Sequence, residues 1–172
     1  MAYRPHSTVL AVARIALRGA NTRDAERLIT DGVVGGPLPA GESWLSRIES
    51  WLSEMSKGRR LVMVADDGRK LLGVAQLVFV LPAGKNDPDA ANGLDTAMVE
   101  TLRAGPEAPP TLATQMINEL ENYARKRRIK TITFLVPMDN NRVLAQVKGW
   151  GFEEFRIMPE GTRLLAFFKK AI

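Results

Sequence analysis

The chain has 172 residues, of which 45% are hydrophobic and 25% charged, the composition of one globular domain with its own apolar core. It has no cysteine and one histidine, His6, which excludes disulfides, cysteine-ligated zinc, thiol nucleophiles and sites built from several histidines, so we expect no metal site. Lys and Arg number 24 against 19 Asp and Glu, and the formal charge of +5 is compatible with an anionic ligand.

The sequence shows no sign of a membrane protein. No apolar run approaches the roughly 20 residues that a membrane span requires. Residues 1–17 are interrupted by Arg4 and Arg14, and they lack the order of charge, apolar stretch and small-residue cleavage site of a signal peptide. We therefore expect a single domain over residues 1–172, in the cytoplasm and with no membrane partner.

The N-terminal half of the chain predicts a strand, two helices and a β-hairpin. The clearest helix is amphipathic, because Ile48, Trp51 and Met55 follow Trp44 at helical spacing. We expect its apolar stripe to pack on a sheet, and a tryptophan of the stripe to line a substrate pocket. The preceding helix would be capped by Asn21 or Thr22. The expected ranges are a strand over 8–17, helices over 21–32 and 42–57, and hairpin strands over 61–65 and 70–81.

The C-terminal half predicts two strand–helix pairs and a final hairpin. Thr111 is expected to cap a strong helix whose end is basic, which suits the negative end of the helix dipole. The expected ranges are strands over 95–102, 131–136, 152–158 and 163–168, and helices over 111–128 and 139–151. The whole order, β-α-α-β-β-β-α-β-α-β-β, predicts an α/β (α+β) domain with a mixed sheet and helices on both faces.

Two segments resemble a known family. Residues 105–136 form a loop, a helix and a strand, and residues 139–154 read DNNRVLAQVKGWGFEE. The second segment is similar to the pattern Asn-x-x-Ala-x-x-x-Tyr-x-x-x-Gly-Phe, with Asn140, Gly151 and Phe152 in register. Together with the element order over residues 9–168, they resemble the Gcn5-related N-acetyltransferases. The resemblance implies a mostly antiparallel central sheet of six or seven strands. It also implies transfer of an acyl group, acetyl by default, from acetyl-coenzyme A to an amine.

Two departures from the family pattern leave an alternative open. The coenzyme A helix of the family opens with Arg/Gln-x-x-Gly-x-Gly/Ala, whereas residues 108–113 read APPTLA and only Ala113 fits. Pro109 and Pro110 remove two amide donors, so that free amides would begin at Thr111. The tyrosine that often acts as general acid corresponds to Val147. The alternative is therefore a non-catalytic protein of this fold that binds coenzyme A or a protein partner.

Candidate site residues follow from the resemblance. Glu100 is the candidate base, with Asp95 in reserve, because it is an acid within an apolar strand and burial would strengthen it as a base. Its neighbours do not settle the face on which it lies, so a solvent-facing strand glutamate is the alternative. Asn140 and Arg142 would approach the coenzyme, although Asn140 could instead be a plain helix N-cap and Arg142 a solvated cation. The predicted cofactor-binding residues are Leu102, Arg103, Ala104, Thr111, Leu112, Ala113, Thr114, Asn140 and Arg142.

The acceptor is less defined than the donor. The long loop over 82–94 would form one wall of its site and the Gly/Pro-rich segment 32–41 the other, and the acceptor would be a small-molecule or protein amine. The basic run 125–130 suits a solvated helix end, an adenosine 3′-phosphate or nucleic acid, but no aromatic residues alternate with it, which disfavours nucleic acid. Two exposed sheet edges would permit a homodimer.

Overall fold

The computed structural model describes residues 14–172, so His6 and the first part of the strand expected over 8–17 lie outside the described residues. The order of helices and strands expected from the sequence is confirmed over this range. The elements are β1 (Ala16–Gly19), α1 (Asp24–Thr30), α2 (Trp44–Ser56), β2 (Arg60–Asp66), β3 (Leu71–Val78), β4 (Thr96–Ala104), α3 (Leu112–Lys126), β5 (Thr131–Pro137), α4 (Asn141–Gly149), β6 (Glu153–Glu160) and β7 (Arg163–Ala171).

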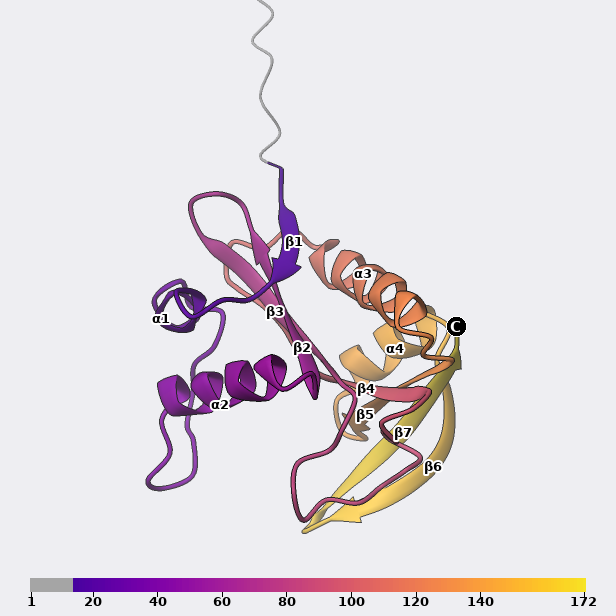
Figure 1. Cartoon of the computed structure of the whole chain (residues 1–172). Coiled ribbons are helices and arrows are strands. Elements are labelled where there is room, and N and C mark those ends of the chain that lie inside the picture. The colour runs from indigo at the N-terminus through magenta and orange to yellow at the C-terminus, as the bar shows by residue number, and fades with distance from the viewer. Residues whose placement is uncertain (1–13) are drawn as a thin grey trace, which may run out of the picture.

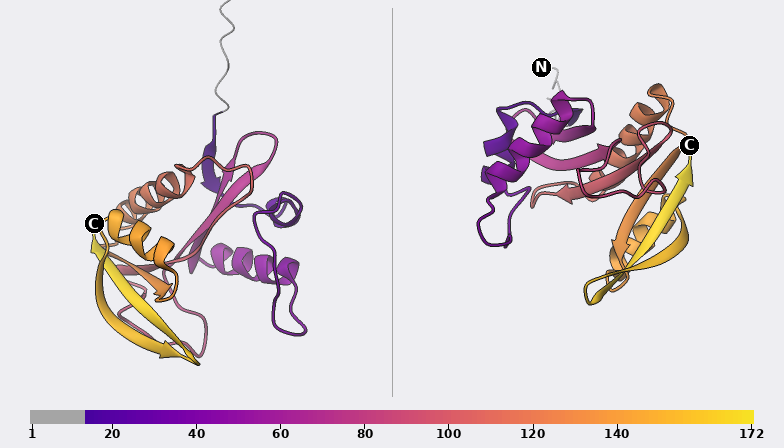
Figure 2. Two further views of the ribbon diagram at one scale, coloured as in Figure 1. Left: turned by 180° about the vertical axis from the view of Figure 1, so that it is seen from behind. Right: turned by 60° about the horizontal axis from the view of Figure 1, so that its bottom comes forward.

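The strands form one sheet in the order β1-β2-β3-β4-β5-β7-β6. Every neighbouring pair is antiparallel except β4 and β5, which run parallel. Helices α1 and α2 lie on one face of the sheet, and α3 and α4 lie on the other (Figures 1 and 2). This confirms the expected mixed, mostly antiparallel sheet with helices on both faces, and it leaves β1 and β6 as the two edge strands.

The sheet separates two apolar clusters. On the α1/α2 face, Ile48 and Trp51 of α2 pack with Val62 and Val64 of β2. On the α3/α4 face, α3 contributes the largest share of the buried side chains, and the alternate residues of β2 and β3 meet it. Both strands are therefore buried on both sides, which explains their nearly continuous apolar sequence. The expected packing of the α2 stripe on a sheet is confirmed.

A cluster of four charged side chains joins β1, α1 and β2. Arg18 donates to Asp24 at 2.7 Å and to Asp66 at 2.8 Å, and Arg27 contacts both carboxylates. Burial alone would raise the pKa of Asp66, but hydrogen bonds from Arg18 and the Gly68 amide outweigh it and bring the pKa to about 2. Burial likewise opposes ionisation of Asp24, yet Arg18 and the Asn21 amide hold its pKa below the usual value.

Two details of the expected elements are corrected. The N-cap of α1 is Arg23, not Asn21 or Thr22, although the Asn21 side chain accepts from the Arg23 amide at 3.0 Å just before the helix. The α2 helix begins two residues later than expected, because Ser43 is its N-cap and accepts from the Ser46 amide. Within residues 14–172 no helix combines the length and the apolar character needed to cross a membrane.

Candidate functional site

The sheet opens between its two parallel strands. β4 and β5 pair only from Thr96–Thr131 to Val99–Phe134. Beyond that point β4 continues along β3 to Ala104, and β5 continues along β7 to Pro137. The facing edges of the two strands therefore diverge, and the backbone of residues 102–104 borders the resulting gap. Leu102, Arg103 and Ala104 thus lie where an extended ligand could add to β4 as a strand.

A β-bulge in β4 coincides with the start of this gap. Gln76 pairs with Glu100 and Val74 with Arg103, so that two residues, Thr101 and Leu102, stand opposite one. Thr101 has a φ of 53°, in the left-handed region that β-branched residues rarely adopt. The extra residue turns both Glu100 and Arg103 toward α2, while Leu102 packs into the core on the α3 side.

The side chain of Arg103 consequently does not extend along the gap. It lies over the Trp44 ring of α2, 4.8 Å from its centroid, and its Nη1 donates to the carbonyl of Gly35 at 3.3 Å. The backbone of Arg103 borders the gap while its side chain points toward α2, and the backbone is the part that the resemblance assigns to the coenzyme. Trp44 in turn donates to the Gly36 carbonyl at 3.1 Å, so the segment 32–41 is held against α2 and β4.

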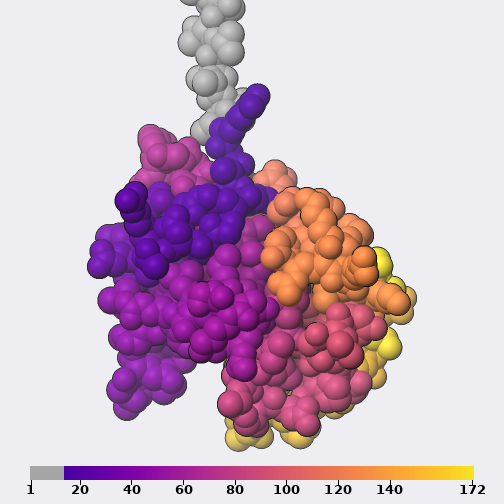
Figure 3. Space-filling view, viewed as in Figure 1, coloured from indigo at the N-terminus to yellow at the C-terminus, as the bar shows by residue number. Residues whose placement is uncertain are grey.

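A hollow of about 520 Å³ lies between α2, β4 and the loop that follows β3. It opens as a notch between α2 and the 82–94 loop at the lower edge of Figure 3. Both predicted walls border it, through Gly41 on one side and Pro82 and Lys85 on the other. The larger part comes from residues 42–51, and both Trp44 and Trp51 line it, in agreement with a tryptophan-lined pocket. The sheet contributes Arg60, Glu100, Thr101 and Arg103.

Glu100 lies in this hollow beside a buried cation. Its side chain is 41% exposed, so of the two orientations that the sequence leaves open, Glu100 has the one that faces solvent. The Arg60 side chain is only 5% exposed, and its Nη1 lies 4.0 Å from a carboxylate oxygen of Glu100 and 2.7 Å from Oε1 of Gln76. Arg60 Nε and Gln76 Nε2 are buried and have no hydrogen-bond partner among residues 14–172. The sheet side of the hollow therefore holds polar groups with unused donors.

The start of α3 lies at the end of the loop that leaves β4. Thr111 occupies the N-cap position but makes no capping hydrogen bond, which corrects its expected role. The Leu112 amide donates to the Pro109 carbonyl at 3.0 Å and its side chain is buried, so Leu112 has no free donor. Within residues 14–172 the amides of Ala113 and Thr114 donate to no protein acceptor. The helix therefore presents two free amides at its positive end.

The two ends of α4 have different neighbours. Trp150, at its C-terminal end, donates to the Thr114 hydroxyl at 3.1 Å and so meets the first turn of α3. Asn140 is the N-cap and accepts from the Val143 amide at 3.2 Å, which is the plain capping role. Arg142 lies in the first turn of α4, about 12 Å along the helix axis from Trp150, so it sits at the other end of α4 from the contact with α3.

Other candidate groups pack away from the gap. Val147 has no proton to donate and is fully buried, and Tyr123 packs on Phe79 with ring centroids 6.3 Å apart. The basic run 125–128 is exposed at the end of α3, a helix of 15 residues and so roughly 22 Å from its start. Arg127 there stacks on Phe79 at 4.0 Å. This agrees with a solvated helix end and separates the run from the free amides.

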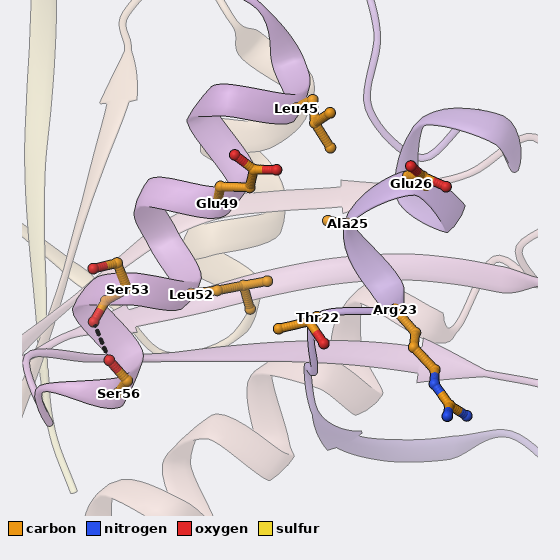
Figure 4. Close-up of a pocket in the computed structure, with 9 residues that line it drawn as sticks. All are labelled: Thr22, Arg23, Ala25, Glu26, Leu45, Glu49, Leu52, Ser53 and Ser56. Carbon is orange, nitrogen blue, oxygen red and sulfur yellow. Dashed lines mark hydrogen bonds between the residues drawn. The ribbon is translucent and has the colours of Figure 1, made fainter.

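A second hollow, of about 530 Å³, lies between α1 and α2. Figure 4 shows Thr22, Arg23 and Glu26 on one side and Leu45, Glu49 and Leu52 of α2 on the other, with Ser56 donating to the Ser53 carbonyl at 2.6 Å. No residue of β4 or β5 lines it. It is therefore separate from the gap, and α2 stands between the two hollows.

No protein-family model and no curated protein sequence matches the chain. Solved structures do match it over most of its length. A ribosomal-protein-alanine N-acetyltransferase from Brucella melitensis has a TM-score of 0.70 at 18% identity and covers 91% of this chain and 99% of its own. A spermidine/spermine N-acetyltransferase from Vibrio cholerae has a TM-score of 0.68 at 15% identity, covering 92% of both chains.

A third similar structure, from Salmonella typhimurium, was solved with its cofactor acetyl-CoA; its TM-score is 0.69 at 13% identity, covering 92% of this chain and 94% of its own. At such identities the likeness concerns the fold. The chain has the fold of the Gcn5-related N-acetyltransferases, which confirms the expectation from the element order and the two resembling segments.

Proposed function

We propose that the protein is an N-acyltransferase that transfers an acyl group, acetyl by default, from acetyl-coenzyme A to an amine. The observation that carries this proposal is the position of the β4 bulge. There, β4 and β5 diverge into a gap, and the hollow that contains Glu100 adjoins the same residues. A donor in the gap and an acceptor in the hollow would meet at one point of the sheet.

The donor side offers groups that fit coenzyme A. The backbone of residues 102–104 would pair with the amide groups of the pantetheine arm as a neighbouring strand does. The free amides of Ala113 and Thr114, at the positive end of a 15-residue helix, would bind the pyrophosphate. Trp150 borders that helix start and offers a flat apolar surface next to it.

The acceptor side offers a group that can take a proton. Acetyl-coenzyme A supplies the thioester carbon that the amine attacks. Glu100 would accept the proton of the amine, directly or through a water molecule, as the N–C bond forms and the C–S bond breaks. A backbone amide of residues 102–104 would donate to the carbonyl oxygen. Because Val147 has no proton to give, coenzyme A would leave as the thiol after taking its proton from water.

Calorimetric titration tests the donor first. We expect acetyl-coenzyme A and free coenzyme A to bind in the micromolar range, and adenosine 3′,5′-bisphosphate to bind more weakly, because it lacks the pantetheine arm. Thiol release with a panel of amines then tests transfer. Binding without transfer to any amine would favour the non-catalytic alternative, which the buried Val147 and the prolines at 109 and 110 support. If none of the three binds, the proposed cofactor site is wrong.

A further inference from the structure

We infer that the acceptor is a small amine that also carries a carboxylate, as an amino acid does. Its carboxylate would bind Arg103 and Lys85, and its amine would lie beside Glu100. This inference rests on the proposed function, since it names the substrate class of the same hollow. Three observations support it: two cations of the hollow have no carboxylate partner, the guanidinium of Arg103 is held in place by its neighbours, and Glu100 and Arg103 lie close enough for one small ligand to reach both.

The charged side chains that line the hollow do not balance. Four are cationic, namely Arg47, Arg60, Lys85 and Arg103, and two are anionic, namely Glu42 and Glu100. Arg47 pairs with Glu42 at 2.5 Å, and Arg60 lies nearest to Glu100. Within residues 14–172, Lys85 and Arg103 have no carboxylate partner. The two unpaired cations predict an anionic group on the ligand and disfavour a polycation such as spermidine.

The guanidinium of Arg103 is held in place without being neutralised. One of its faces rests on the Trp44 ring and one nitrogen donates to the Gly35 carbonyl. Neither contact removes the charge, and the remaining N–H groups stay available. A guanidinium fixed in this way loses little conformational entropy when it binds a carboxylate through two parallel hydrogen bonds. Arg103 therefore has the properties of a carboxylate-binding residue.

The spacing of the two key side chains suits a small molecule. The bulge places Glu100 and Arg103 on one face with two strand steps between them, a Cα separation of roughly 7 Å. One ligand with an amine and a carboxylate a few bonds apart can reach both side chains. The hollow, at about 520 Å³, is of the size that small-molecule sites have.

Steady-state thiol release tests this inference. The panel contains phenylalanine, glutamate and β-alanine, each beside its carboxamide, together with O-phosphoethanolamine and spermidine. We expect the ratio of kcat/KM for each acid to that for its carboxamide to be about tenfold to a hundredfold higher in the wild type than in Arg103→Gln, the effect of one charge-assisted hydrogen-bond pair. In Arg103→Gln the kcat/KM of the acid should fall by this factor, through a higher KM, while that of the carboxamide stays unchanged. In Lys85→Met the kcat/KM of the acid should fall by a part of this factor.

Because each comparison uses the same acid–carboxamide pair in two proteins, the intrinsic reactivity of the amine cancels. Arg163→Gln, which removes an exposed cation on β7, is the matched control and should keep the preference. The carboxylate assignment is overturned if Arg103→Gln leaves the acid-to-carboxamide ratio of kcat/KM at its wild-type value, or if spermidine or O-phosphoethanolamine is the better acceptor.

A binding measurement distinguishes a failure of the proposed function from a failure of the carboxylate site. If no amine releases thiol, the affinity of the hollow for a carboxylate can still be measured. Calorimetry with N-acetylphenylalanine and with its carboxamide, without any acyl donor, gives the two binding constants. Binding of the acid that is stronger than that of the carboxamide and is lost in Arg103→Gln would support the carboxylate site and reject the acyltransferase. Equal binding, or no binding of either ligand, would overturn the carboxylate site as well.

Discussion

Glu100 and Arg103 act on one hollow only because β4 contains one residue too many for its partner strand. In a regular strand, residues three positions apart lie on opposite faces. Thr101 and Leu102 together stand opposite Ala75, and this restores the same face for Glu100 and Arg103. The bulge thus positions both the proposed base and the proposed carboxylate-binding residue, and it also exposes the β4 edge to the gap.

Replacing the carboxylate of Glu100 tests its role as the base. We expect Glu100→Gln to lower kcat by about a hundredfold to ten-thousandfold, the usual contribution of a general base, with the affinity for coenzyme A unchanged. Thiol-release kinetics and calorimetry measure the two quantities. Glu153→Gln on the edge strand β6 removes an exposed carboxylate far from the gap and should keep full activity. A Glu100→Gln protein with near-normal kcat would show that another group takes the proton.

The left-handed backbone of Thr101 should cost stability. A non-glycine residue in this conformation costs about 1–2 kcal/mol, whereas glycine costs about 0.5–1 kcal/mol through the entropy of the unfolded chain. Thr101→Gly should therefore raise the free energy of unfolding by about 0.5–1 kcal/mol, measured by urea denaturation. Thr96→Gly, in the same strand without a positive φ, should lower it. Equal losses in both variants would mean that the bulge is not strained.

At the scale of elements, the first turn of α3 carries the proposed phosphate site without the usual glycines. Pro109 and Pro110 cannot donate, and the Leu112 amide is occupied by the Pro109 carbonyl. Only the second and third positions of the helix keep free amides. The site would therefore depend on Ala113 and Thr114 more heavily than a site with a glycine-rich loop.

Removing one of these amides should weaken the donor site alone. Proline is tolerated in the first turn of a helix, so Ala113→Pro should fold while it deletes one donor to the pyrophosphate. We expect coenzyme A to bind about tenfold to a hundredfold more weakly, the value of one hydrogen bond to a charged group. Ala113→Gly keeps the amide and is the control in calorimetry. Unchanged affinity in the proline variant would place the pyrophosphate elsewhere.

The order of the elements could be predicted from the sequence because hydrophobic periodicity and turn residues are local signals. The Trp44 helix and the β run 131–136 are examples, each confirmed to within two residues. The hollow could not be predicted, because Arg60, Lys85 and Arg103 come from three separate segments. The face on which Glu100 lies depends on a bulge at a threonine, and no local pattern marks it. The exposure of Glu100 follows from the same cause.

At the scale of the whole molecule, the sheet separates the proposed sites of the two substrates. Helices α3 and α4 cover the face on which coenzyme A would bind, whereas α2 and the segment 32–41 cover the face of the hollow (Figure 1). The charged cluster around Asp24 and Asp66 joins α1 and β1 to β2.

The same cluster should make the fold sensitive to acid. The pKa values of Asp66 and Asp24 are lowered on folding, to about 2 for Asp66, so the unfolded chain takes up protons first as the pH falls. The contribution of Asp66 to stability is complete above about pH 4 and is lost between about pH 4 and pH 2, and the contribution of Asp24 is likewise lost as the pH falls below about 4. We expect Asp66→Asn to lower the free energy of unfolding at pH 7 by about 1–2 kcal/mol and to flatten its fall over that interval, measured by urea denaturation at each pH.

The control is Asp139→Asn, which breaks an exposed pair with Arg163. Its free energy of unfolding should depend on pH as that of the wild type does. An Asp66→Asn curve that runs parallel to the wild type would mean that other carboxylates control the acid transition.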